Sequence, residues 1–592
     1  MSRNRAKPEL QLPERERARG PSVRRRMTLV VSLLSLAALG LLAQAVKLQV
    51  VDKRFYQAQG NARFLREVPI PVSRGSIFDR NGVPLAVSTP VESIWANPQE
   101  VLDHTDRMPE LARALGIDAD DLEQYLDQRA NREFVYLKRR MSPEAAQAVL
   151  NLKIPGVNEQ REFRRYYPLG AVTAHVLGFT NIDDHGQEGL ERAYDQWLSG
   201  EAGSKRVIRD RLGHTVETVD MVRAPKPGHD LTLSIDRRIQ YLAYRQLDET
   251  VKKFKASSAS MVIMDPRTGE VLAMVNLPSY NPNAVGNSNP AQRRNRAVTD
   301  VVEPGSTAKA FTVAAALESG KWTPTTKIDT SPGWIQLYGH TIKDDENNGV
   351  LDVTGVITRS SNIGAAKMAL SLTPDAMYKV FRDFGFGAST GSGFPGESAG
   401  LLPIGGDWRP IRQATIGYGY GFSVTALQLA QAYCVFADGG LLRAPSFVKG
   451  QDNTPKRVLS PRVAQEVVNM LKTVVEPGGT AYRTAAIANY TVAGKTGTSH
   501  IAEAGGYSNS NYNSLFAGMV PASNPRLVGV VIVRGAQGGY FGTTVAAPVF
   551  SSVMKGALRL LDIPPDNVPQ LYASHGGAAA MQGGRSRQEG AR

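Results

Sequence analysis

The sequence contains a serine and a lysine whose spacing could support acyl transfer. Ser306 and Lys309 follow the chain-breaking pair Pro304-Gly305 and open a run of helix-forming residues that ends at Glu318. If this run is helical, the two side chains share one face at its first turn. A desolvated lysine can lose its own proton and accept that of the serine, and a helix N-terminus stabilises a developing oxyanion. Alone, this spacing is common by chance, and a helix-capping serine beside a surface lysine is the simpler interpretation.

A second polar motif, Ser360-Ser361-Asn362, lies fifty-four residues beyond Ser306. A serine hydroxyl here could relay a proton between a lysine and a leaving amine, and the asparagine amide could hold a substrate carbonyl. By itself the tripeptide is ordinary loop composition. The motif therefore matters only in combination with others in the same domain.

A third motif, Lys495-Thr496-Gly497-Thr498, follows a strand-like segment at residues 490–493. On an edge strand, Lys495 could supply positive charge for a substrate carboxylate, and Thr496 a hydroxyl beside it. Gly497 would let a substrate backbone approach closely. A phosphate-binding loop is the rival interpretation, but it needs a glycine at position 489, where the chain has asparagine.

The three motifs occur in the order S-x-x-K, S-x-N and K-T-G within one domain, which makes a strong combined signal. The same set, with S-D-N in the middle, is typical of class A β-lactamases and penicillin-binding proteins. Here Ser361 replaces the aspartate and leaves the serine and the asparagine of the motif intact.

On these motifs the chain resembles the class B penicillin-binding proteins, which are membrane-anchored peptidoglycan D,D-transpeptidases. The resemblance covers roughly residues 25–562 and includes residues 74–82, 295–297, 303–306, 417–419 and 425–428. Residues 295–299 leading to Glu303 are similar to the division-specific septal enzyme rather than to the elongation enzyme. The implied fold class is α/β (α+β): a β-lactamase-like serine acyltransferase domain, preceded by a mixed α+β pedestal and one transmembrane helix.

The resemblance also implies the catalytic steps. Lys309, kept neutral, takes the proton of Ser306, which attacks the carbonyl of the penultimate D-Ala of a stem peptide. Ser360 passes a proton to the departing D-Ala. An amine from a second stem then attacks the acyl-enzyme and forms the cross-link, so no metal or organic cofactor is needed.

The remaining motif residues are implied to hold the substrate. Asn362 would hold the peptide, and Lys495 with Thr496 the terminal carboxylate. The backbone N–H groups of Ser306 and Thr498 would form the oxyanion hole. The substrate-binding set is therefore expected to comprise Asn362, Lys495, Thr496, Gly497 and Thr498.

The N-terminal region predicts a membrane anchor. Residues 27–46 carry no charge, follow Arg24-Arg25-Arg26, and are long enough to span a bilayer with the arginines on the cytoplasmic side. A cleaved signal peptide is the alternative, because Ala43-Gln44-Ala45 resembles a cleavage site, but its apolar region would be shorter. We therefore expect an uncleaved single-pass anchor in the cell inner membrane, with the catalytic domain periplasmic.

At 592 residues the chain is too long for a single core. We expect a basic cytoplasmic tail at residues 1–26, a transmembrane helix at 27–47 and a non-catalytic pedestal at 48–229. A transpeptidase domain should follow at 230–564, and a disordered tail at 565–592. By resemblance, the pedestal would meet division partners, including a septal glycosyltransferase, while the substrate would be peptidoglycan stem peptides and the inhibitors β-lactams.

Local patterns predict individual elements. We expect pedestal helices at residues 109–115 and 119–126 and after Ser142-Pro143, and an Asn-Gly turn at residues 81–82. The catalytic domain should contain a strand at 232–235, a helix at 236–250 and a hairpin around residues 261–275. A strand at 527–533 and a helix at 547–561 should close it. The glycine-rich residues 417–421 are expected to form a turn lining the cleft.

Composition leaves few other functions open. The net charge of +14 could suggest nucleic acid, but nine of the Lys/Arg residues lie in residues 1–26 and no recognition motif accompanies them. One cysteine, Cys434, and eight scattered histidines give no readable zinc site, and His500 is expected to be a solvated residue at the rim. The alternative to a transpeptidase is a penicillin-binding sensor or division scaffold that does not cross-link. Such a protein should carry a cytoplasmic output domain or several membrane-spanning helices.

A β-lactamase would need a base that activates water against the acyl-enzyme. In class A enzymes a glutamate does this through an ordered water. No acidic residue lies within the three motifs, although Glu397 lies between the second and third and stays a candidate from sequence. We therefore expect a long-lived acyl-enzyme rather than rapid hydrolysis.

Overall fold

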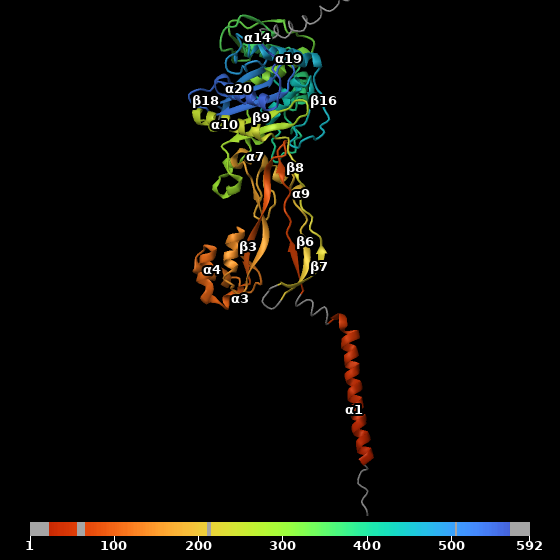
Figure 1. Cartoon of the computed structure of the whole chain (residues 1–592). Helices are drawn as coiled ribbons and strands as arrows, with labels where there is room; N and C mark the ends of the chain where they lie inside the picture. The colour runs from red at the N-terminus through yellow and green to blue at the C-terminus, as the bar shows by residue number, and fades with distance from the viewer. Residues whose placement is uncertain (1–22, 56–64, 210–214, 504–505, 569–592) are drawn as a thin grey trace, which may run out of the picture.

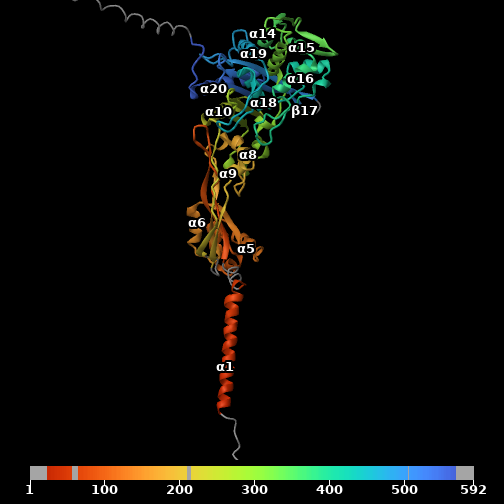
Figure 2. The ribbon, with the colours of Figure 1, turned by 90° about the vertical axis from the view of Figure 1, so that its right-hand side faces the viewer.

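The computed structural model describes residues 23–55, 65–209, 215–503 and 506–568, arranged as a helix, an elongated pedestal and a compact head (Figures 1 and 2). Helix α1 (Val23–Val46) continues into a π-helical turn, Lys47–Val51, and all of its side chains are exposed. It is the one helix among these residues that is long and apolar enough to cross a membrane. The expected tails fall largely outside the described residues, which omit 1–22 and 569–592.

The pedestal is built on antiparallel strands that run lengthwise between the base and the head (Figure 1). The long strand β3 pairs with β2, β4 and β5, and β2 runs parallel to β8. A separate sheet has the order β1-β6-β7. The strands are β1 (Leu65–Ile70), β2 (Ile77–Phe78), β3 (Pro84–Ala96), β4 (Val135–Met141), β5 (Val157–Tyr166), β6 (Gly203–Arg209), β7 (Thr215–Arg223) and β8 (Leu231–Thr232).

Short helices give the base of the pedestal a core of its own. They are α3 (Pro98–Leu102), α4 (Met108–Leu115), α5 (Ala119–Asp127) and α6 (Pro143–Leu150), and their buried apolar residues form one cluster with β3 and β4. The side chains of Asp118 and Ser142 accept hydrogen bonds from backbone N–H groups at the starts of α5 and α6. The three helices expected here are confirmed, as is the Asn81-Gly82 turn, where Gly82 has a φ of +80°.

A buried ion network joins the pedestal segments below the head. Glu191, in α8 (Gly189–Ala193), accepts from Arg74 Nε at 2.6 Å and from Arg165 Nε at 2.7 Å, and all three side chains are at most 2% exposed. Arg74 also lies 2.6 Å from Asp195 in α9 (Asp195–Leu198). Charges buried this deeply must be paired to be tolerated, so the network connects the segment at Arg74, near the start of the pedestal, to β5, α8 and α9.

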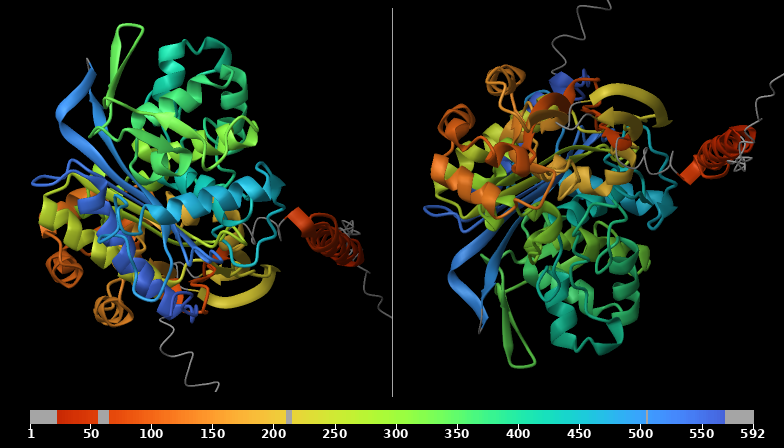
Figure 3. Two further views of the ribbon diagram at one scale, coloured as in Figure 1. Left: turned by 90° about the horizontal axis from the view of Figure 1, so that it is seen from above. Right: turned by 90° about the horizontal axis from the view of Figure 1, so that it is seen from below.

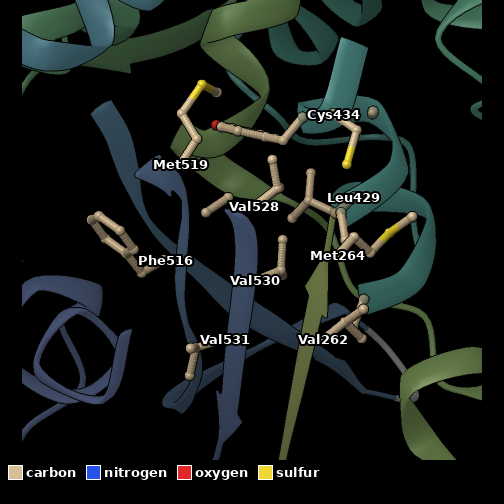
Figure 4. Close-up of a cluster of buried hydrophobic side chains, with 14 of the residues drawn as sticks. Val262, Met264, Leu429, Cys434, Phe516, Met519, Val528, Val530 and Val531 are labelled. Carbon is tan, nitrogen blue, oxygen red and sulfur yellow. The ribbon is translucent and has the colours of Figure 1, made fainter. Parts of the chain in front are cut away.

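The head is centred on a five-stranded antiparallel sheet with the order β10-β9-β19-β18-β17. The strands are β9 (Ser258–Met264), β10 (Val271–Leu277), β17 (Ala493–Glu503), β18 (Gly506–Val520) and β19 (Leu527–Arg534). Helices α10 (Arg237–Phe254) and α20 (Gly542–Leu560) pack together on one face, and α18 (Ala426–Ala437) covers the other. Figure 4 shows this packing, with Val262, Val528 and Val530 toward Leu429 and Cys434 of α18, and Phe516 on the opposite side of the sheet.

Most of the remaining head is helical and lies on the α18 side of the sheet (Figures 1 and 2). Its elements are α13 (Lys309–Glu318), α14 (Val353–Thr358), α15 (Asn362–Leu370), α16 (Pro374–Asp383), α17 (Pro410–Gly417) and α19 (Pro461–Thr473). Smaller elements are α11 (Pro290–Arg293), α12 (Arg296–Thr299), β15 (Leu441–Leu442) and β16 (Lys456–Arg457). Helix α7 (Ala174–Leu177) belongs to the pedestal and lies just below the head (Figure 1). Two small hairpin-like pairs complete the head: β11 (Lys327–Asp329) with β14 (Val350–Asp352), and β12 (Trp334–Leu337) with β13 (His340–Lys343).

The head matches the expected α/β (α+β) class, with local differences. The helix at 236–250, the hairpin around 261–275 and the strand at 527–533 are confirmed as α10, β9–β10 and β19. The strand expected at 232–235 ends at Thr232, because the backbone beyond it makes only single contacts: Leu233 forms an isolated bridge with Val448, and Ser234 N donates to the Phe447 carbonyl. The C-terminal helix begins at Gly542 rather than at 547 and includes Pro548.

The buried network predicts a large effect of a nearly isosteric change. Glu191→Gln leaves two buried guanidinium groups without their shared carboxylate, so we expect it to cost about 3–5 kcal/mol of folding free energy. Glu201→Gln, which removes the carboxylate of an exposed pair with Lys226, should leave the urea midpoint unchanged. Urea unfolding followed by circular dichroism measures both, and equal midpoints for the two variants would contradict the role of the network.

Candidate active site

The nucleophile turn is a 3₁₀ segment, Gly305–Ala308, that leads directly into α13. The helix expected from Ser306 to Glu318 is therefore confirmed, with a tighter first turn. Ser306 is half-buried and Lys309 is fully buried, and Lys309 Nζ lies 3.0 Å from Ser306 Oγ. The predicted i, i+3 placement thus brings the hydroxyl and the amine into direct contact.

Tight backbone contacts hold this turn in place. The Gly305 N–H donates to the carbonyl of Gly419 at 3.1 Å, and a Cβ on Gly419 would lie 1.9 Å from the Gly305 oxygen. Gly419 also has a φ of +98°, so only glycine fits there. Tyr433 of α18 is fully buried and donates its hydroxyl to the carbonyl of Thr307 at 2.9 Å. The turn expected at residues 417–421 therefore lies against the turn that carries Ser306.

Ser360 lies between two lysines. Its Oγ is 3.1 Å from Lys309 Nζ and 2.9 Å from Lys495 Nζ, and Lys309 Nζ also contacts the Ser360 carbonyl. Ser360 has a φ of +61°, a left-handed conformation that is uncommon for a residue other than glycine. Such strained residues cluster at functional sites, where the surrounding structure holds them. The arrangement gives one hydroxyl that can exchange protons with either amine.

Burial sets the protonation of both lysines. Lys309 and Lys495 are 0% exposed. Burial lowers the pKa of Lys309 to about 7, although the carboxylates of Asp344 and Asp345 oppose that shift. Burial also lowers the pKa of Lys495 well below its usual value, and the neighbouring charge of Lys309 lowers it further. Near neutral pH, Lys309 can therefore be neutral and accept a proton from Ser306.

The S-x-N segment is anchored by a residue that sequence reasoning did not identify. Asp344 Oδ1 accepts from the N–H groups of Asn362 and Ile363 at 2.6 and 3.0 Å, and its Oδ2 accepts from the Ser361 hydroxyl at 2.5 Å. Ser361, in turn, caps α15 by accepting from Gly364 N. A carboxylate at a helix N-terminus is favoured by the exposed N–H groups and by the helix dipole. Asp344 thereby fixes the start of α15, directly after Ser360.

The substituted middle position of this motif has a structural role. Where an aspartate would stand in S-D-N, Ser361 is 1% exposed and points toward Asp344 and the first turn of α15. Asn362 is half-buried, and its Nδ2 donates to the carbonyl of Lys343 at 2.7 Å. The Asn362 amide is thus held by the end of β13, which leaves its carbonyl oxygen for a substrate.

The K-T-G segment lies on β17, the edge strand of the sheet, as expected. Thr496 Oγ1 lies 3.3 Å from the hydroxyl of Thr480. A Cβ on Gly497 would lie 2.9 Å from the Pro304 carbonyl oxygen, so this glycine also allows the strand to pack on the nucleophile turn. Thr498 Oγ1 accepts from Gly542 N, at the start of α20.

Glu303 connects three segments next to the turn that carries Ser306. Its Oε1 accepts from Gly421 N at 2.7 Å and from the Tyr507 hydroxyl at 2.8 Å, while its carbonyl accepts from Ser499 Oγ at 2.8 Å. Burial raises the pKa of the Glu303 carboxyl. Its position three residues before the nucleophile was visible in the sequence, but its contacts depend on the tertiary fold.

Two further residues named from the sequence, His500 and Glu397, make contacts within their own segments. His500 is half-buried, with Nδ1 2.8 Å from the Ser508 carbonyl and its ring 4.6 Å from that of Tyr512, so it packs within the β17–β18 hairpin. The Glu397 carboxylate accepts from Thr390 N at 2.6 Å and from Ser392 Oγ at 2.7 Å. Glu397 thus stabilises its own loop, which disfavours a role in activating water.

Comparisons with known proteins agree with this geometry. The family described as "Penicillin binding protein transpeptidase domain" matches residues 259–555, and "Penicillin-binding Protein dimerisation domain" matches residues 69–233. The chain is 45% identical over 545 residues to a probable peptidoglycan D,D-transpeptidase PbpC of Pseudomonas aeruginosa, covering 92% of this chain and 96% of that protein. It is 40% identical over 563 residues to the peptidoglycan D,D-transpeptidase FtsI of Escherichia coli, covering 94% and 95%.

Solved structures show the same architecture. The transpeptidase domain of Burkholderia pseudomallei penicillin-binding protein 3 is 42% identical, with a TM-score of 0.53, and covers 57% of this chain and 98% of its own. Penicillin-binding protein 3 of Mycobacterium tuberculosis, in complex with aztreonam, is 28% identical, with a TM-score of 0.65 over 84% of this chain and 98% of its own. The second comparison extends beyond the head into the pedestal.

The buried amine predicts the pH dependence of the site. Lys309 must be neutral to accept a proton, and its pKa is lowered to about 7. We expect acylation of the wild-type protein by penicillin to rise about tenfold per pH unit below 7 and to level off above it. Rates measured between pH 5 and 9 test this. Lys309→Arg keeps a charge at all these pH values and should give a low, flat profile, whereas a rate that falls with rising pH would exclude a neutral Lys309 as base.

Asp344→Asn should slow acylation about tenfold, because hydrogen bonds to a charged group contribute about 1.5–3 kcal/mol and hold the S-x-N segment. Removing this carboxylate also removes a charge that raises the pKa of Lys309, so the midpoint of the pH profile should move to lower pH. Asp352→Asn is the matched control, because Asp352 caps the neighbouring α14 by accepting from Gly355 N. Equal rates and midpoints for the two variants would contradict the role of Asp344.

Proposed function

The chain belongs to the penicillin-binding protein transpeptidase family, and we propose that Ser306 is the nucleophile through which it cross-links peptidoglycan. The observation that carries this proposal is the contact of a buried Lys309 amine with Ser306 Oγ at 3.0 Å, with the pKa of that amine lowered to about 7. The protein is a serine-type D,D-transpeptidase that acts on stem peptides in septal cell-wall synthesis and is inhibited covalently by β-lactams.

Acylation follows from the positions of these groups. Lys309 accepts the Ser306 proton while Oγ attacks the carbonyl carbon of the penultimate D-Ala. The backbone N–H groups of Ser306 and Thr498 stabilise the oxyanion. Ser360 then donates its proton to the departing D-Ala nitrogen and regains one from Lys309, 3.1 Å away. The peptide bond breaks, and an ester to Ser306 takes its place.

The second half-reaction uses the same groups in reverse. The amine of a second stem peptide attacks the ester carbonyl, loses a proton toward Ser360 and Lys309, and releases Ser306 as the cross-link forms. Asn362 holds the donor peptide. Lys495 and Thr496 hold the terminal carboxylate of the incoming donor before D-Ala leaves, and a carboxylate beside Lys495 would raise the pKa of that amine again.

We assign the parts of the chain accordingly. Residues 1–26 form a cytoplasmic tail, 27–47 a transmembrane helix, 48–229 the pedestal, 230–564 the transpeptidase domain and 565–592 a C-terminal tail. The matched family ranges, 69–233 and 259–555, support the two central assignments. The exposed apolar helix α1 supports a single-pass anchor, with the catalytic domain on the periplasmic side of the inner membrane.

The pedestal is proposed to meet partners of the division complex, including a septal glycosyltransferase. It extends as a separate elongated body between the membrane helix and the head (Figure 1). The matches to FtsI of Escherichia coli and to PenA of Neisseria meningitidis each cover 94% of this chain, so they include the pedestal.

Mass spectrometry of the intact protein after incubation with penicillin tests the nucleophile and the fate of the ester. We expect one adduct on the wild-type protein, none on Ser306→Ala, and labelling slowed about 10²–10⁴-fold in Lys309→Ala. Because the Glu397 carboxylate is engaged within its own loop, the adduct should persist during a chase. An adduct mapped to another residue in Ser306→Ala, or rapid release of hydrolysed penicillin by the wild type, would contradict the proposal.

A further inference from the structure

The β12–β13 hairpin projects from the head on the same side as the far ends of β17 and β18 (Figures 2 and 3). Its two faces differ. Ile335 and Ile342 are paired across the strands, and Ile342 is 3% exposed in a cluster with Ile363 of α15. The other face and the tip carry the large aromatic side chains, with Trp334 50% exposed and Tyr338 69% exposed. The packing of the inner face explains how the hairpin is held against α15. It does not explain why two large aromatic rings, Trp334 and Tyr338, are exposed.

The outer face combines one aromatic ring with uncharged and cationic hydrogen-bonding groups. The alternation of side chains places Trp334 and Gln336 on this face with Thr341 and Lys343 opposite them. Gln336 Nε2 donates to Thr341 Oγ1 at 2.6 Å, so these two groups are held side by side. A ring beside an amide, a hydroxyl and an ammonium can bind a ligand with an apolar C–H face and polar edges.

The hairpin tip is strained. Tyr338 and Gly339 both have positive φ, +51° and +80°, as a tight two-residue hairpin turn requires. Glycine, asparagine and aspartate adopt this conformation readily, whereas a bulky tyrosine does so rarely. A strained, exposed ring at the tip therefore points to a function rather than to stability.

The base of the hairpin is bonded to the active site. Asn362 Nδ2 donates to the Lys343 carbonyl at 2.7 Å, and Asp344 N donates to the Gly333 carbonyl at 3.0 Å, closing the hairpin directly beside the S-x-N segment. Four residues per strand extend about 13 Å from that point. A substrate whose peptide occupies the cleft would bring the group attached to that peptide toward this face.

We propose that the outer face of the β12–β13 hairpin binds the sugar chain that carries the stem peptides; this rests on the proposed function. The C–H face of an N-acetylated sugar stacks on Trp334, and its acetamido and hydroxyl groups bond to Gln336 and Thr341. The hairpin thus makes the enzyme selective for peptides attached to a glycan strand.

Binding of soluble glycan strands bearing stem peptides, compared with the free stem peptide, tests this on the full-length protein. Trp334→Ala should weaken strand binding about tenfold and leave binding of the free peptide unchanged. Tyr338→Gly removes the ring and the strain together, so it should weaken strand binding while maintaining or raising Tm. A purely structural role for Tyr338 would lower Tm instead. Tyr241→Ala, which removes a ring that is 53% exposed on α10, is the control and should change neither affinity.

The possible outcomes distinguish a failure of this inference from a failure of the proposed transpeptidase function. Penicillin is too small to reach the hairpin from the cleft, so its acylation of Ser306 should be equal in all these variants and reports on the proposed function alone. Unchanged strand affinity in both Trp334→Ala and Tyr338→Gly would overturn the inference, as would an equal loss for the strand and the free peptide. Loss of acylation in the wild type would instead overturn the proposed function.

Discussion

The active site depends on burying two lysine amines next to one hydroxyl. Lys309 and Lys495 are completely shielded from water, and both reach Ser360 Oγ. Two ammonium groups at this distance in a dry environment would repel strongly and lose their hydration, so the fold favours a state in which a proton is missing from the pair. Burial lowers the pKa of Lys309, the amine in contact with Ser306, to about 7, so a neutral amine can lie beside Ser306 near neutral pH. The same desolvation that would destabilise the charged site therefore creates its reactivity.

Only a rigid frame can maintain such a site, and the frame here is built from close backbone contacts. Gly419 lies against Gly305, Gly497 against Pro304, and Gly542 against Gly497, each at a distance where a Cβ would clash with a backbone oxygen. The nucleophile turn, the edge strand and the start of α20 are thus stacked without intervening side chains. Side-chain packing alone leaves room for small adjustments, whereas stacked backbones do not. The positions of the Ser306, Lys495 and Thr498 backbones are consequently coupled.

The sequence predicted what depends on local spacing. Ser306 and Lys309 meet because helical geometry places i and i+3 on one face. The strand expected at residues 490–493 is wrong except at its last residue, because β17 begins at Ala493 and contains Lys495 itself. Asp344 could not be found this way, because its contact with α15 arises only when the chain passes through β14 and α14 and returns to it, eighteen residues later. The strand expected at 232–235 is shorter for a related reason: from Leu233 on, the backbone contacts Phe447 and Val448, which are distant in sequence. The three site motifs lie on separate elements, so only their family resemblance linked them before the fold was known.

The pedestal and the head are joined through polar contacts as well as through the chain itself. Asn295 Nδ2 donates to the His175 carbonyl at 2.9 Å, and Asn276 Nδ2 donates to Asn295 Oδ1 at 2.7 Å. Asn276 lies on β10 of the head sheet, and its own Oδ1 accepts from Ala297 N in α12. Both asparagine side chains are buried, so breaking one contact leaves an unpaired group rather than exchanging it for water. Because α12 ends shortly before Glu303, these hydrogen bonds fix the segment that leads from the contact with the pedestal to the turn that carries Ser306.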